Sequence, residues 1–108
     1  MEKVIIYLPE VAIHFKHLVS ILFEKEYFGF VESAEEYVLK IRSFIEENIG
    51  IYPAKQTPAK FKLYGENYIL YKANKRTTWY IFFSQIEQSF FVKFITNNHT
   101  AFIGNFNP

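Results

Sequence analysis

The sequence is notable first for what it lacks. It contains no cysteine and no aspartate, and only four glycines and four prolines. The absence of cysteine excludes disulfides, zinc fingers and thiol nucleophiles, and the absence of aspartate excludes a Ser–His–Asp triad. The scarcity of glycine and proline excludes collagen-like and low-complexity architectures.

Long apolar runs are also missing. The longest are about five residues, whereas a membrane-spanning helix needs ~20. We expect no signal peptide, because the segment MEKVIIYLPE is too short and Glu10 comes too early in it. Dinucleotide-binding, P-loop, zincin and EF-hand motifs are absent, so we expect no metal and no cofactor. These features predict a cytoplasmic protein with no membrane contact.

Aromatic residues make up 20% of the 108 residues, which is enough to build a large core in one domain spanning residues 1–108. Charge is distributed unevenly along the chain. Residues 1–50 carry five Lys and Arg against nine Glu, whereas residues 51–108 carry seven against two. The second half is therefore basic, which is typical of a surface that meets nucleic acid or an acidic protein segment. The alternative is that helices simply favour Glu while strands tolerate Lys.

The hydrophobic period of the first half is helical. Apolar residues recur every three or four positions over residues 10–25, and a Ser33–Glu36 capping box begins a second helical stripe that Gly50 ends. Residues 4–7 precede the helices as a short strand. We expect the helices to form an antiparallel hairpin that packs on a sheet through a shared set of side chains: Phe15, Leu18, Leu22, Val38, Ile41 and Ile45.

The second half is rich in aromatic and β-branched residues. Residues 51–58 form a connector containing Pro53 and Pro58. After it, the predicted strands are 61–64, 68–72, 77–84 and 90–96, separated by gaps short enough for hairpins. Residues 79–83 are apolar on both faces, as expected of a central strand. On the last strand, alternation places Phe91, Lys93 and Ile95 on one face and Val92 and Phe94 on the other. The fold class is α+β, with the short strand and helical hairpin packed on a three- to four-stranded antiparallel sheet.

This order of elements resembles the RelE/ParE superfamily of bacterial type II toxins. Residues 64–71, YGENYILY, resemble the family's Gly–x–x–Tyr–Arg–x–x–Tyr strand, although Ile69 or Leu70 stands where many members carry Arg. Residues 78–83 resemble the strand that follows it. Residues 90–99, FFVKFITNNH, resemble the final strand, and here Thr100 follows His99 where the family has arginine. The resemblance covers nearly the whole chain through the order of these motifs.

The resemblance implies a toxin that cleaves ribosome-bound mRNA without a metal. In that reaction the substrate 2′-hydroxyl attacks the neighbouring phosphate, and the protein supplies a base, an acid and cations. The implied acid or base is His99, whose unperturbed pKa of ~6.5 suits either role. His14 and His17 lie on the first helix and are expected to have structural or surface roles. The implied phosphate contacts are Lys55, Lys60, Lys62, Arg76 and Lys93, and the implied base-stacking rings are Tyr68, Tyr71 and Tyr80.

The implied partners are a cognate antitoxin with acidic residues, the ribosome and mRNA. Two alternatives stay open. One is a gyrase-inhibiting toxin of the same superfamily, whose partner would be DNA gyrase and which needs no His99. The other is a catalytically degenerate toxin fold that serves as a protein-binding module. The net charge of only +1 and the missing terminal arginine favour these two alternatives. For each lysine the competing role is a solvated edge charge that discourages sheet aggregation.

Overall fold

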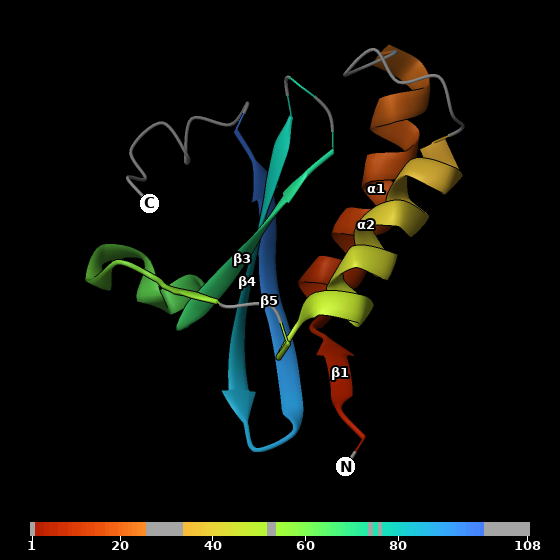
Figure 1. Cartoon of the computed structure of the whole chain (residues 1–108). Helices are drawn as coiled ribbons and strands as arrows, with labels where there is room; N and C mark the ends of the chain where they lie inside the picture. The colour runs from red at the N-terminus through yellow and green to blue at the C-terminus, as the bar shows by residue number, and fades with distance from the viewer. Residues whose placement is uncertain (1, 26–33, 52–53, 74, 76, 99–108) are drawn as a thin grey trace.

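A computed structural model describes residues 2–25, 34–51, 54–73, 75 and 77–98, with only the backbone described for residues 18–25 and 34. The elements in chain order are β1 (Val4–Tyr7), α1 (Pro9–Lys25), α2 (Ala34–Asn48), β2 (Lys55–Gln56), the 3₁₀ helix η2 (Ala59–Tyr64), β3 (Asn67–Lys72), β4 (Thr78–Ile86) and β5 (Ser89–Asn97). The described part is an α+β structure with one five-stranded sheet, two helices on one face and η2 on the other (Figure 1).

The sheet has the strand order β1-β5-β4-β3-β2 and is mixed. Strands β2 to β5 form an antiparallel meander, but β1 pairs with β5 in parallel, with Val4 opposite Ser89 and Tyr7 opposite Val92. The prediction of a purely antiparallel sheet of three to four strands was therefore wrong. The parallel pair is possible because the α1–α2 hairpin and the meander separate its strands, which gives the chain room for a crossover.

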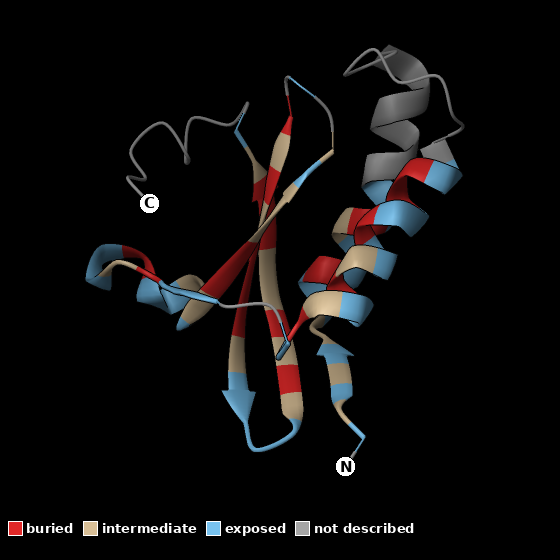
Figure 2. Ribbon diagram, viewed as in Figure 1, coloured by how far each residue is buried: buried red, intermediate tan, exposed pale blue. Residues whose placement is uncertain are grey.

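The helical hairpin packs on the sheet as expected. Figure 2 shows the buried residues along the sheet and on the helix surfaces that face it. Of the predicted contact residues, Phe15, Val38, Ile41 and Ile45 are buried in one cluster with Trp79, Ile81 and Phe83 of β4. The side chains of Leu18 and Leu22 lie outside the described residues. Inside this core the Trp79 indole N–H donates to the Tyr37 hydroxyl at 3.1 Å, which satisfies a polar group that would otherwise be costly to bury.

Strand β4 lies in the interior of the sheet, which confirms the prediction made from its two apolar faces. Phe82 belongs to a second, smaller core with Phe61 and Tyr68 on the face opposite the helices. Phe61 comes from η2, so in the described part of the chain this helix covers the second face.

The segment predicted as a strand at residues 61–64 is instead η2. The Phe61 N–H donates to the Pro58 carbonyl at 2.8 Å and the Gly65 N–H donates to the Lys62 carbonyl at 3.1 Å, which is the three-residue spacing of a 3₁₀ helix. Alternation would have buried Phe61 and Leu63 together, but Leu63 is 81% exposed. Residues of the predicted connector also form a strand, because Lys55 and Gln56 pair with Tyr68 and Asn67.

A β-bulge at Lys93 overturns the predicted alternation of β5. Phe82 pairs with Phe94, whereas the next residue, Phe83, pairs with Val92, so Lys93 has no direct partner in this ladder. Val92 therefore faces the helices while Phe94 packs in the smaller core, and Ile95 returns to the helix side. An extra residue reverses the pleat, and period-two reasoning has no means of locating it.

Candidate functional site

Three of the predicted phosphate-binding lysines lie on β2, an edge strand of the sheet, and on η2, and together they make up a basic edge. Lys55 lies on β2, and Lys60 and Lys62 lie on η2, which follows β2 closely in the chain. All three are exposed, so their charges are available to a ligand. The Lys60 Nζ lies 5.8 Å from the centroid of the Phe61 ring, within the range of a cation–π contact. The prediction that Lys60 and Lys62 share one face of a strand was wrong, because both belong to the 3₁₀ helix.

Lys93 lies apart from these lysines. It lines a small cavity of about 80 Å³ together with Glu10 and His14 of α1, on the side of the sheet that the helices cover. The buried Nε2 of His14 has no hydrogen-bond partner among the described residues. Burial, reinforced by neighbouring His17, lowers the pKa of His14 below its usual 6.5. The structure therefore does not bring Lys93 into a common phosphate site with Lys60 and Lys62.

The three tyrosines predicted to stack on bases are divided between the two faces of the sheet. Tyr68 is 1% exposed and belongs to the smaller core, so its prediction as a base platform was wrong. Burial also raises the pKa of the Tyr68 hydroxyl, with a further contribution from Tyr80. Tyr71 packs at 4.8 Å from the Phe44 ring on the helix side, whereas Tyr80 lies 6.4 Å from the Tyr68 ring on the other. Tyr71 and Tyr80 cannot form one stacking row.

Two predicted site residues, His99 and Arg76, lie outside the described residues. Their placement relative to the basic edge stays a prediction. In the chain, His99 follows Asn97, the last residue of β5, by two residues.

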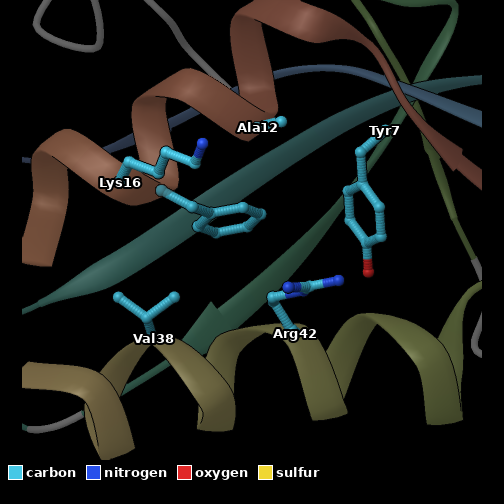
Figure 3. Close-up of a pocket in the computed structure, with 6 residues that line it drawn as sticks. Tyr7, Ala12, Lys16, Val38 and Arg42 are labelled. Carbon is cyan, nitrogen blue, oxygen red and sulfur yellow. The ribbon is translucent and has the colours of Figure 1, made fainter.

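Another cavity lies between the two helices and β1, where the sequence suggested no site. Its volume is about 290 Å³, and it is lined by Tyr7 of β1, by Ala12, Phe15 and Lys16 of α1, and by Val38 and Arg42 of α2 (Figure 3). Its lining is mainly apolar, with two cationic side chains. Each cation follows an apolar lining residue by one helical turn, Lys16 after Ala12 and Arg42 after Val38, which places each pair on one side of its helix. The sequence carries no signal that these helix sides meet Tyr7 of β1.

Aromatic rings hold the Arg42 guanidinium in this cavity. Its Cζ lies 5.1 Å from the centroid of the Tyr7 ring and 5.9 Å from that of Phe15. These two rings meet edge to face at 5.9 Å, so together they form a rigid aromatic wall. The Tyr7 hydroxyl donates to Glu46 Oε2 at 3.4 Å. Burial and the charge of Glu46 raise the pKa of Tyr7 above its usual 10.0, against the opposing effect of Arg42.

Residues with metal-binding side chains do not cluster anywhere in the described ranges: no group of three or more His or Glu is arranged to hold an ion. Neither described helix is long and apolar enough to cross a membrane. Comparison of the chain with models of protein families, with curated proteins and with solved structures gave no match.

Proposed function

We propose that this protein is the toxin of a bacterial type II toxin–antitoxin pair with a RelE/ParE-like fold, acting on ribosome-bound mRNA in the cytoplasm. The observation that carries the proposal is the order of the elements. A strand, a two-helix hairpin and an antiparallel meander follow one another in the chain, as in the family that the sequence resembles. The distribution of charge supports it, because exposed Lys55 lies on β2, the edge strand farthest from β1, and exposed Lys60 and Lys62 lie on η2, which follows β2 in the chain.

In the proposed reaction the 2′-oxygen of the RNA attacks the adjacent phosphorus and the 5′-oxygen leaves. The products are a 2′,3′-cyclic phosphate and a 5′-hydroxyl end, so water is not the nucleophile in this step. Lys60 and Lys62 would contact the phosphates, and their positive charge would stabilise the extra negative charge of the transition state. His99 would take the proton from the 2′-hydroxyl or give one to the 5′-oxygen.

The basic edge also defines the expected antitoxin. A helix or strand with acidic residues would cover Lys55, Lys60 and Lys62, and it would prevent them from contacting RNA. Because the same lysines would serve both partners, antitoxin binding and RNA binding should exclude each other.

Two other candidates, a protein-binding module and a gyrase-directed toxin, would use the same fold. The observation in their favour is that the residues predicted to contact RNA do not lie together in one site. Lys93 lies at the cavity beside α1, and Tyr68 is buried in the smaller core. A protein of this kind would need neither His99 nor base-stacking tyrosines.

Primer extension on a reporter transcript, in a translating extract, distinguishes these functions. The wild-type protein should cut the transcript, and His99→Ala should reduce cutting by roughly 10²–10⁴-fold while leaving the protein folded. Lys60→Ala and Lys62→Ala should weaken cutting less, and their effect should shrink at high salt because it arises from phosphate charge. Lys72→Ala removes an exposed lysine from β3 and serves as the matched control.

Transcripts left intact by folded wild-type protein would eliminate the nuclease. A parallel assay with DNA gyrase would then separate the two remaining candidates, because only a gyrase-directed toxin produces DNA breaks. Full cutting by the His99→Ala variant would remove His99 from the mechanism but leave the nuclease in place.

A further inference from the structure

The cavity between α1, α2 and β1 contains none of the residues proposed to act on RNA, and its lining combines two chemical properties. Phe15, Val38 and Ala12 provide apolar surface, while Lys16 and Arg42 provide two positive charges (Figure 3). Ligand sites in proteins typically join a mainly apolar lining to a few polar groups that fix the orientation of the ligand. Here both of the charged lining residues are cations.

The positive charge of the cavity is not neutralised by a carboxylate of the described residues. Arg42 contacts the rings of Tyr7 and Phe15 and shares a side-chain hydrogen bond with Tyr7, and among the described residues neither Arg42 nor Lys16 forms an ion pair. The acidic residue one turn along α2, Glu46, instead accepts a hydrogen bond from the Tyr7 hydroxyl. The planar guanidinium therefore retains N–H donors, in the geometry that suits a carboxylate.

The size of the cavity limits what it can hold. Its volume of about 290 Å³ is at the lower end of ligand pockets, which run from roughly 300 to 1,000 Å³. One aromatic ring or a short alkyl chain with a single acidic group fits this space.

We propose that this cavity binds a small monocarboxylate with an aromatic or short aliphatic body. The body packs against Phe15, Val38 and Ala12, and the carboxylate accepts hydrogen bonds from Arg42 and Lys16. The site draws residues from α1, α2 and β1, so occupancy links the three elements. It is independent of the toxin proposal, because the cavity shares no residue with the basic edge.

The test uses 3-phenylpropionate as the probe and its neutral analogue 3-phenylpropionamide as the control ligand. Each is titrated into the ¹⁵N-labelled full chain to about 10 mM, and amide shifts are followed by NMR. The acid should produce saturable shifts at Ala12, Phe15, Val38 and Arg42, and it should bind at least about 10-fold more tightly than the amide because only the acid carries charge.

Variants of the chain locate the charge that is recognised. Arg42→Gln should weaken binding of the acid by about 10-fold or more and leave binding of the amide unchanged. Arg42→Lys keeps the charge without the planar fork and should give an intermediate affinity. Lys72→Gln removes the same charge from a distant exposed position on β3 and should have no effect.

Three outcomes would overturn the proposal. They are no saturable shift with the acid, shifts that map to other elements, and equal affinity for the acid and the amide. The comparison of the two ligands uses only the wild-type chain, so it holds even if an Arg42 variant fails to fold.

Discussion

Replacing Ile41 with alanine tests how the helical hairpin packs on the sheet. Ile41 lies in the middle of α2 with 0% of its surface exposed, in the cluster that includes Trp79 and Ile81 of β4. Removing the side-chain carbons leaves a cavity between helix and sheet that neighbouring side chains fill only in part. Substitutions of this type cost about 2–5 kcal/mol in the free energy of unfolding.

The size of the thermal effect follows from the length of the chain. Unfolding entropy is roughly 2.1 cal/mol/K per residue, so 1 kcal/mol corresponds to about 4 °C for a domain of this length. Ile41→Ala should therefore lower Tm by about 8–20 °C, measured by circular dichroism at 222 nm. A urea titration should show a lower midpoint with an unchanged slope.

Leu39→Ala is the matched control, because it removes a similar amount of side chain from the same helix at a position that is 59% exposed. It should change the free energy of unfolding by less than about 0.5 kcal/mol. Equal losses from Ile41→Ala and Leu39→Ala would refute the assignment of the buried face of α2. So would an Ile41→Ala variant as stable as the wild type.

Three further predictions concern single positions. Tyr37→Phe removes the acceptor of the 3.1 Å hydrogen bond from buried Trp79 and should cost about 1–3 kcal/mol by urea denaturation; an unchanged midpoint would contradict this bond. Gly65→Ala should cost more than about 1 kcal/mol, because Gly65 has φ 148° and a Cβ there would lie 2.7 Å from the Phe83 nitrogen; wild-type stability would contradict this backbone geometry. Since burial lowers the pKa of His14 in the folded state, the unfolded chain binds a proton at His14 more readily than the folded chain does. Neutral His14 contributes fully to stability above the pKa of the unfolded chain, about 6.5, and this contribution is lost as pH falls through the lower pKa of the folded state. His14→Gln should therefore flatten the acid side of the plot of unfolding free energy against pH. A plot identical to that of the wild type would contradict this.

Local patterns in the sequence were sufficient to predict the bounds of the short strand, the end of the first helix and the three long strands. The strand at Val4–Tyr7 was predicted with its observed bounds, and the first helix ends at Lys25 as predicted. The three long strands differ from their predicted bounds by one or two residues. Composition and turn residues located these strands, whereas the bulge in β5 breaks its alternation and β4 is buried on both faces.

The errors occurred where distant contacts decide the structure. The parallel pairing of Val4–Tyr7 with β5 joins segments more than eighty residues apart, and no local pattern specifies a partner at that distance. The bulge at Lys93 changes which side chains face the helices without leaving a mark in the hydrophobic pattern. The alternating residues after Pro58 satisfy a strand and a 3₁₀ helix about equally, and packing of Phe61 on Phe82 and Tyr68 favours the helix.

The candidate sites, like the fold, could be predicted where local sequence decides and not where distant contacts decide. Exposure of Lys55, Lys60 and Lys62 could be inferred from charge alone, whereas burial of Tyr68 required knowing that η2 covers its face. The cavity beside Arg42 is formed by three elements, and only the tertiary structure brings Tyr7 next to α2.

The growth of bacteria after induction of this chain is the most direct measurement of the proposed function. Induction should slow growth within the period in which soluble protein accumulates, and co-expression of an acidic antitoxin encoded beside the gene should restore it. Lys60→Ala combined with Lys62→Ala should reduce the toxicity, whereas Lys72→Ala should leave it intact. Unimpaired growth at high soluble expression of the wild-type chain would contradict the toxin function.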